Sequence, residues 1–319
     1  MDDFKTFNDM QDFPEARGPN RRTLLKCGLW AGAGVLWTVS GGIPRSVGLG
    51  WGEAALADSA SFSFVQVSDS HIGFDKAANP DATGTFRQSI ERVKELPVRP
   101  SFMIHTGDVS HLSKPDQFDT AEQIMKEAGL DAYYVPGEHD VLGDDGKAFF
   151  DRFSRKTPGW YSFDQGGVHF VALINVLAFK AGGFGHLGGE QLLWLESDLK
   201  EQSSSTPIVV FTHIPLWMVY EDWGWGTDDA AQALGYLKRF GSVTVLNGHI
   251  HQVIQKVEGT ISFHTAYSTA YPQPAPGTAP NPGPLKVEPA RLKSLLGIAN
   301  INLVPSNQRL AIIDTPLNA

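Results

Sequence analysis

The stretch Ser101-Phe102-Met103-Ile104-His105-Thr106-Gly107-Asp108 is an apolar run that ends in a glycine and a carboxylate. A short apolar run closed by glycine predicts a buried strand of a layered α/β domain. Ligands of such sheets bind just beyond the carboxyl ends of the strands. We therefore expect Asp108 to lie at the edge of a binding site.

Four further apolar runs also end in carboxylate or imidazole side chains. Because the strands of a sheet share one rim, the five ends together bring three or four carboxylates and five imidazoles to it. Such a set can bind two metal ions, with Asp108 as the natural bridge. The other runs and their polar residues are Phe62–Val67 with Asp69 and His71, Tyr133–Val135 with Glu138, His139 and Asp140, Ile208–Phe211 with His213, and Val243–Leu246 with His249 and His251.

The composition is that of an ordinary globular protein with a sizeable core. The chain has 319 residues, of which 42% are hydrophobic and 19% charged, enough for one large domain or two small ones. Its net charge of -9 argues against a nucleic-acid backbone or an anionic membrane surface as the main partner, since those need clustered Lys and Arg.

Residues 1–57 are predicted to be a signal peptide. The segment Asn20-Arg21-Arg22-Thr23-Leu24-Leu25-Lys26 has a twin-arginine pattern, and the apolar stretch after it is too short and glycine-rich to span a bilayer. Ala55-Leu56-Ala57 offers a cleavage site. We expect the twin-arginine translocation machinery as a partner during bacterial export, and a periplasmic or secreted mature protein without a stable membrane span. The alternative is an uncleaved membrane anchor.

The mature domain is predicted to be residues 58–319. Cys27, the only cysteine, lies in the predicted signal, so the mature protein would contain no thiol. His and carboxylate side chains would then have to bind any metal. Twin-arginine export carries folded proteins, often with a metal already bound, which agrees with a metal site.

Strands and helices alternate from Ser61 onward, which predicts two packed sheets with helices outside. A hairpin of Trp160–Phe163 and Val168–Ile174 would make part of the sheet antiparallel. Residues 271–289 are proline-rich and predict a long, ordered or semi-rigid surface loop. Helices are expected at 86–96, 118–128, 192–199 and 230–240, and closing strands at 298–303 and 310–313.

Along the chain the polar blocks are Asp-x-His, Gly-Asp, Gly-x-His-Asp, a lone His after a strand, and Gly-His-x-His. This series resembles the calcineurin-like metallophosphoesterases. The resemblance implies a four-layer α-β-β-α sandwich, in which two mixed sheets are flanked by helices, with a dinuclear metal centre. The ligands that it implies are Asp69, His71, Asp108 and His251 for metal 1, and Asp108, Glu138, His213 and His249 for metal 2.

The resemblance also implies a metal-dependent hydrolase of phosphate mono- or diesters that acts on a small phosphoester substrate. Two cations about 3.5 to 4 Å apart lower the pKa of a shared water and clamp the phosphoryl oxygens, so that metal-bound hydroxide attacks phosphorus in line. Imidazole and carboxylate ligands suit Mn, Fe or Zn. His139 would donate the proton to the leaving group, and Asp108 would bridge the two ions.

Two positions depart from the family pattern. Glu138 stands where the family has Asn, and its extra negative charge would tighten metal 2, favour a harder ion and weaken the attraction for phosphate. The alternative function is therefore a non-hydrolytic dinuclear metal protein used for binding, sensing or redox chemistry. His111 stands where purple acid phosphatases carry a tyrosine ligand. Because His71 already fills that metal position, we interpret His111 as pocket lining or as a structural residue.

Four aromatic residues, Trp217, Tyr220, Trp223 and Trp225, follow His213 in a glycine-containing segment. They could stack a nucleobase or another flat group, but packing beneath the proline-rich loop is the preferred interpretation. No basic residue stands in any of the blocks, so recognition of a second phosphate is not indicated.

Overall fold

The computed structural model describes residues 36–40, 43–47, 62–153, 159–178, 183–304 and 309–318. The chain forms two compact units, Met1–Leu56 and Ala57–Ala319. In the first unit, β1 (Leu36–Ser40) pairs antiparallel with β2 (Ile43–Val47). The signal peptide stays a prediction, and its other residues, the twin-arginine segment among them, lie outside the described ranges. Within the described ranges, no helix combines the length and the apolarity needed to cross a bilayer.

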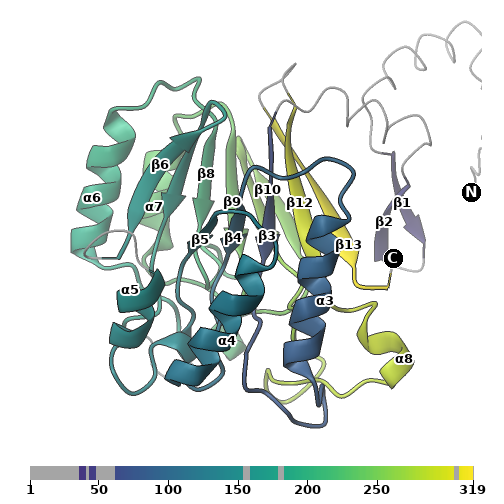
Figure 1. Ribbon diagram of the computed structural model, residues 1–319. Helices are drawn as coiled ribbons and strands as arrows, with labels where there is room; N and C mark the ends of the chain where they lie inside the picture. The colour runs from purple at the N-terminus through teal and green to yellow at the C-terminus, as the bar shows by residue number, and fades with distance from the viewer. Residues whose placement is uncertain are drawn as a thin grey trace, which may run out of the picture. The chain divides into compact units, whose positions relative to one another are not determined.

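The second unit begins with a five-stranded mixed sheet in the order β13-β12-β3-β4-β5 (Figure 1). Strands β3, β4 and β5 run parallel, whereas β12 pairs antiparallel with both β3 and β13. In this register Val65 lies opposite Met103 on one side and Asn300 on the other. The bounds are β3 Ser63–Val67, β4 Met103–His105, β5 Ala132–Tyr134, β12 Gly297–Val304 and β13 Arg309–Pro316.

A six-stranded mixed sheet has the order β10-β11-β9-β8-β7-β6. Its centre is parallel from β7 through β8 and β9 to β11, and β6 and β10 form antiparallel edges. The bounds are β6 Tyr161–Gln165, β7 Val168–Ala172, β8 Ile208–Phe211, β9 Val243–Asn247, β10 Gln255–Glu258 and β11 Ile261–Thr265.

Alternation along the strands places the hydrophobic core on both faces of each sheet. In β3, Phe64 lies on the face that packs between the two sheets. Val65 and Val67 lie on the opposite face, which packs under helices. The ring of Phe64 stacks on Phe102 of the adjacent segment at 5.2 Å and meets Phe170 of the other sheet edge-on at 5.1 Å. These aromatic contacts join the two sheets into one core.

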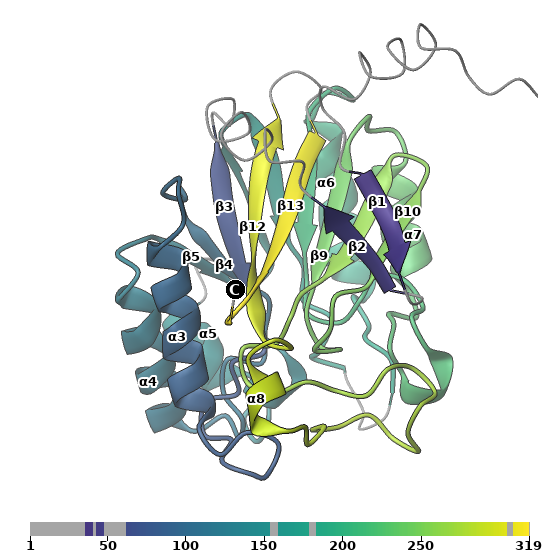
Figure 2. The same cartoon turned by 90° about the vertical axis from the view of Figure 1, so that its right-hand side faces the viewer.

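Helices cover the outer faces of both sheets, and Figure 2 shows the strands between the two helical layers. Helices α3, α4 and α5 share an apolar cluster with the five-stranded sheet, and α6 and α7 share one with the six-stranded sheet. The predicted architecture of two mixed sheets flanked by helices is therefore confirmed. The bounds are α3 Ala82–Lys94, α4 Pro115–Lys126, α5 Lys147–Phe153, α6 Gly189–Lys200, α7 Ala230–Leu237 and α8 Pro289–Leu292.

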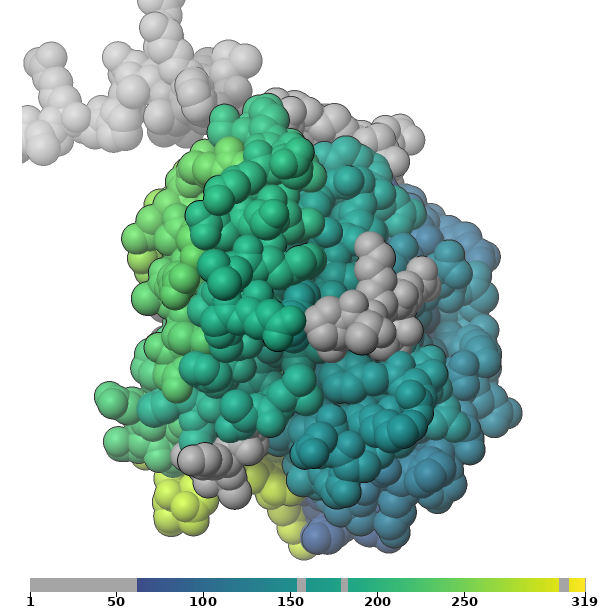
Figure 3. Space-filling view, turned by 90° about the vertical axis from the view of Figure 1, so that its left-hand side faces the viewer, coloured from purple at the N-terminus to yellow at the C-terminus, as the bar shows by residue number. Residues whose placement is uncertain are grey.

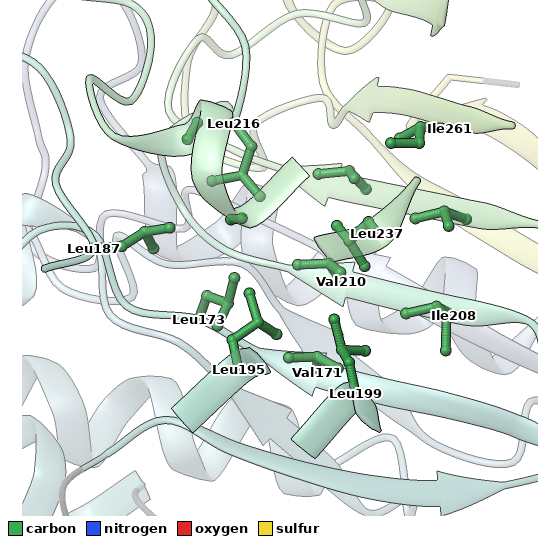
Figure 4. Packing of buried hydrophobic residues seen from close by; sticks show 14 of the residues in the cluster. Val171, Leu173, Leu187, Leu195, Leu199, Ile208, Val210, Leu216, Leu237 and Ile261 are labelled. Carbon is green, nitrogen blue, oxygen red and sulfur yellow. The ribbon is translucent and has the colours of Figure 1, made fainter. Parts of the chain in front are cut away.

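Helix α6 illustrates how this covering arises from the sequence. Leu195 and Leu199, one helical turn apart, point toward Val171 and Leu173 at the end of β7 (Figure 4). Figure 3 views the molecule from the side that α6 covers, on the left in Figure 1. Burying such leucine side chains stabilises the layer by about 1.5 to 3 kcal/mol each.

The observed elements differ from the predicted ones at several places. Strand β7 ends at Ala172 instead of Ile174, and α7 ends at Leu237 instead of Phe240. The hairpin turn is shorter than expected: Asp164 and Gln165 belong to β6, and Gly166 and Gly167, both with positive φ, form a two-residue turn. Helix α5 and the strands β10 and β11 were not predicted. The closing strands are confirmed as β12 and β13.

Candidate metal centre

The backbone takes positive φ angles just after three of the five strands that carry candidate ligands, namely β3, β4 and β9. Five of the seven predicted ligand residues have positive φ, a region that costs a residue with a side chain about 1 kcal/mol or more. Such backbone strain clusters at functional sites, where the surrounding structure holds it. The five are Asp69, His71, Asp108, His249 and His251, with φ between 40° and 70°.

Glycine is required where these turns approach one another. Gly107 has a φ of 96°, and a Cβ atom at this position would lie 2.4 Å from Nδ1 of His213 and 2.7 Å from the backbone nitrogen of Gly137. Any side chain would therefore push three of the strand-end loops apart. This explains why the second block must be Gly-Asp.

The first group of candidate ligands is Asp69, His71, Asp108 and His251, and all four are buried. Nε2 of His71 lies 3.2 Å from Nε2 of His251 and 3.3 Å from Oδ2 of Asp108. Nε2 of His251 lies 3.2 Å from Oδ1 of Asp69. These ligand atoms surround a common point, as the ligands of one metal ion do.

The second group is Glu138, His213 and His249. The Glu138 carboxylate lies between the two rings, 2.9 Å from Nε2 of His213 and 3.0 Å from Nδ1 of His249. Oδ2 of Asp108 is 3.5 Å from the same His213 nitrogen and 3.3 Å from Nε2 of His71. Asp108 therefore reaches both groups, as a bridging ligand must.

Two buried polar atoms of the second group are not hydrogen-bonded to each other and are free to bind a cation. Oε2 of Glu138 and Nε2 of His213 have no hydrogen-bond partner despite their short separation. A buried polar atom without a partner costs about 1 to 3 kcal/mol, more if it is charged. A metal ion between them would satisfy both, so the residues fit the group that the resemblance implies.

Backbone carbonyls fix which ring nitrogens face the centre. Nδ1 of His213 donates a hydrogen bond to the oxygen of Thr106 at 2.7 Å, and Nδ1 of His251 donates one to the oxygen of Tyr271 at 2.6 Å. A carbonyl can only accept, so these nitrogens carry the proton. In both rings Nε2 is left as the ligand atom, an arrangement typical of metal-binding histidines.

The charges in the site favour a cation. Burial lowers the pKa of His213, but Asp108 and Glu138 outweigh it and raise that pKa well above its ordinary value. Burial raises the pKa of Glu138, yet His249 and His213 hold it well below its usual range. The pair therefore stabilises positive charge beside an ionised carboxylate, and a metal ion supplies such charge.

His139 and His111 stack at the edge of the centre, with ring centroids 4.9 Å apart. Burial lowers the pKa of His139, but Asp108 and Glu138 outweigh it, and the pKa is raised. Burial, followed by the neighbouring His139, lowers the pKa of His111 to about 4. Of the two rings, His139 therefore holds the proton. Its Nδ1 donates to the oxygen of His111 at 2.7 Å, so Nε2 is the edge that can reach a substrate.

The structure brings together every predicted ligand and His139. It also places His111 in the site, since Nδ1 of His111 lies 3.4 Å from Nδ1 of His71. The aromatic segment packs as preferred only in part. Trp223 and Trp225 share an apolar cluster with Ala279 of the proline-rich loop, whereas Trp217 packs in the core against Phe263 of β11. Metal binding by these residues nevertheless stays a prediction.

Sequence reasoning assigned no role to Asp140. The buried Asp140 carboxylate accepts hydrogen bonds from the backbone nitrogens of Val109, Ser110 and Gly137 at 2.7 to 3.1 Å, and so joins the loops that carry Asp108 and Glu138. Burial, and after it the charge of Asp108, raises the pKa of Asp140 to about 7. Its place at the end of the Gly-x-His-Asp block was the available signal.

A second missed residue is Tyr271, the first of the proline-rich loop. Its hydroxyl lies 3.2 Å from Nε2 of His71, and its ring lies 4.5 Å from that of His251. Burial, followed by the charges of Asp108 and Asp69, raises the pKa of the phenol well above its ordinary value. A loop expected on the surface thus begins inside the candidate metal centre.

Several known phosphoesterases are similar to this chain in sequence. A 3',5'-cyclic-nucleotide phosphodiesterase of Nostoc sp. is 24% identical over 216 residues, covering 66% of this chain and 79% of the relative. The serine/threonine-protein phosphatase CPPED1 of Danio rerio is 27% identical over 224 residues, covering 61% and 71%. A probable glycerophosphodiester phosphodiesterase, GpdQ, of Arcobacter nitrofigilis is 23% identical over 220 residues, covering 65% and 78%.

Solved structures show the same fold. A dimetal phosphatase from Danio rerio superposes with a TM-score of 0.61 at 14% identity, covering 81% of this chain and 97% of that one. A purple acid phosphatase from yellow lupin superposes with a TM-score of 0.59 at 14% identity, covering 81% and 52%. The family model described as calcineurin-like phosphoesterase matches residues 62–253. The chain therefore belongs to the calcineurin-like phosphoesterases, metal-dependent hydrolases with a dinuclear transition-metal centre.

Proposed function

We propose that this phosphoesterase hydrolyses small phosphodiesters at two metal ions that share Asp108. The observation that carries the proposal is the convergence of two ligand groups on that carboxylate, with Oδ2 of Asp108 at 3.3 Å from His71 and 3.5 Å from His213. Metal 1 would be held by Asp69, His71, Asp108 and His251, and metal 2 by Asp108, Glu138, His213 and His249. When bound, two such cations activate water and polarise the phosphoryl group.

The charge of the site supports a diester rather than a monoester. Asp69, Asp108 and Glu138 bring three carboxylates, and within the described residues every ion pair that they form is with a histidine. A phosphate monoester carries about two negative charges near neutral pH, whereas a diester carries one. The extra carboxylate of Glu138 therefore disfavours the monoester more. The names of the cyclic-nucleotide and glycerophosphodiester phosphodiesterases among the relatives agree with this choice.

We assign the proton donation to His139. Its Nδ1 is held by the oxygen of His111, so Nε2 carries the proton that leaves. The departing alkoxide needs that proton, whereas a nitrophenolate leaves without it. The backbone nitrogen of His139 also donates to Oδ1 of Asp108 at 3.0 Å, which fixes the ring relative to the shared carboxylate.

The proposal is tested by metal content and by turnover of paired substrates. The purified protein should hold two transition-metal ions (Mn, Fe or Zn) and hydrolyse bis(4-nitrophenyl) phosphate with a higher kcat/KM than 4-nitrophenyl phosphate. His139→Ala should lower turnover of diesters with alkyl leaving groups about 10²- to 10⁴-fold and of nitrophenyl diesters much less. His186→Ala, a change at an exposed histidine, is the matched control. Two bound metals without turnover of either ester would favour the non-hydrolytic alternative.

We further propose that the protein is exported through the twin-arginine machinery and works in the periplasm or outside the cell. The proposal rests on the pattern around Arg21 and Arg22 and on the small residues that precede Asp58. The signal, residues 1–57, would be removed and leave a mature domain of residues 58–319.

A further inference from the structure

Tyr271 places a phenol inside the candidate metal centre, although none of the five sequence blocks contains it. Its side chain is buried, with 3% of its surface exposed. It belongs to a loop 200 positions after His71, yet its oxygen lies 3.2 Å from Nε2 of that histidine. The mechanism above gives this phenol no role.

The environment of that His71 nitrogen indicates more than a hydrogen bond. Nε2 of His71 has three neighbours at nearly one distance: Nε2 of His251 at 3.2 Å, the oxygen of Tyr271 at 3.2 Å and Oδ2 of Asp108 at 3.3 Å. A ring nitrogen has one lone pair or one N–H and cannot bond to three atoms. Ligands held roughly 2.0 to 2.2 Å from one cation, by contrast, lie about 2.8 to 3.6 Å from one another.

The phenol ring is held where it is. It packs 4.3 Å from the ring of Phe74, 4.9 Å from that of His71 and 4.5 Å from that of His251. The backbone of Tyr271 is fixed at both ends, since its nitrogen donates to Oγ of Ser268 at 3.2 Å and its oxygen accepts from His251. The phenol oxygen of Tyr271 therefore cannot turn away from the centre without disturbing His71 or His251, which are predicted ligands.

We propose that the phenol oxygen of Tyr271 is a further ligand of metal 1, bound as phenolate. The inference rests on the proposed metal centre. On binding, the O–H bond breaks, its proton passes to the solvent buffer, and the oxygen lone pair binds the cation. Phenolate is a hard, anionic oxygen donor, so its presence favours a hard, highly charged ion such as trivalent iron at this position.

The test measures phenolate directly. Metal-free protein is reloaded with Fe(III) or, separately, with Zn(II), and bound metal is counted by elemental analysis. Bound iron should give a visible phenolate-to-iron absorption band, and zinc should give the near-ultraviolet difference spectrum of an ionised tyrosine. Tyr271→Phe should lose both signals. Tyr267→Phe, the same change at a half-buried tyrosine of the same segment, should keep them.

The outcomes separate this inference from the proposed function. Two bound ions without a phenolate signal, or the same signal in Tyr271→Phe, would show that the phenol only hydrogen-bonds to His71 and would overturn the inference alone. Failure of the natural protein to hold two metal ions would contradict the metal centre itself. If the protein does not bind Fe(III), the difference spectrum of the zinc-loaded protein decides whether Tyr271 is bound as phenolate.

Discussion

At the scale of single residues, Glu138 determines the charge of the second ligand group. Its carboxylate faces His213 and His249 at 2.9 and 3.0 Å, where an asparagine would offer a neutral oxygen. The pKa of Glu138 is held well below its usual range, so the group is ionised at neutral pH. One negative charge here strengthens cation binding and weakens the attraction for a second charge on the substrate.

Glu138→Asn should therefore loosen metal 2 and narrow the preference for diesters. Removing one charge a few ångströms from the phosphoryl group should shift the ratio of kcat/KM for bis(4-nitrophenyl) phosphate over 4-nitrophenyl phosphate about tenfold toward the monoester. Titration of metal-free protein with metal measures the affinity for metal 2, and both rates are then measured under saturating metal. Glu196→Gln on α6 is the control for a lost surface carboxylate. A ratio that stays constant would show that Glu138 does not set the substrate charge.

The site could be predicted from the sequence as far as its motifs reach. Asp69, Asp108 and His213 each follow an apolar run, so local pattern was enough to place them on one rim. Tyr271 carries no such signal, because its neighbour His71 lies on another loop and meets it only in the folded chain. Asp140 was quoted within a motif, but its hydrogen bonds to backbone nitrogens depend on loop geometry.

At the scale of elements, His169 joins the β6-β7 hairpin to helix α6. Nδ1 of His169 lies 2.8 Å from Oδ1 of Asp164 in β6, and Nε2 lies 2.9 Å from Oδ2 of Asp198 in α6. Both acceptors are carboxylates, so both nitrogens must donate, and the ring is charged. Burial lowers the pKa of His169, but the hydrogen bonds to Asp198 and Asp164 outweigh it and the pKa is raised.

This junction should make stability depend on pH. Because the folded pKa of His169 lies above the unfolded value of about 6.5, its contribution is complete below that value and is lost as pH rises through the folded pKa. His169→Gln should cost about 1 to 2 kcal/mol at pH 6 and less at pH 9. Urea unfolding of the natural protein and of His169→Gln is measured from pH 6 to pH 9. At each pH the difference between their free energies of unfolding removes the contributions of other titrating groups. An equal difference at every pH would rule the charged junction out.

Elements with a strong apolar pattern, whether periodic or continuous, were predictable, and strands without such a pattern were not. Strand β8 (Ile208–Phe211) is buried throughout and was found from its sequence. Strand β10 (Gln255–Glu258) is exposed at every residue, so no alternation marks it. The adjacent β11 includes Ser262, His264 and Thr265, whose polarity hides a strand that the core buries. Edge pairing and long-range burial, rather than local pattern, create both.

At the scale of the whole second unit, the last strands complete the first sheet. Strand β12 pairs with β3, so that Asn300 lies opposite Val65 across more than two hundred residues of intervening chain. His264 of β11 also contacts Asp314 of β13 at 3.0 Å, which links the two sheets. The five-stranded sheet therefore cannot be completed until the C-terminal strands are synthesised. Export by a pathway that carries folded proteins agrees with such a topology.

The export proposal predicts where an altered protein accumulates. Changing Arg21 and Arg22 together to Lys keeps the positive charge but removes the twin-arginine pattern, so the chain should stay in the cytoplasm with residues 1–57 attached. Arg17→Lys, outside the pair, is the matched control and should leave export unchanged. Cell fractionation with mass measurement distinguishes the precursor from the mature chain. The proposal has the second unit fold and bind metal before export, so the retained precursor should still hydrolyse bis(4-nitrophenyl) phosphate. Periplasmic delivery of the double variant at the normal level would mean that another route carries the protein.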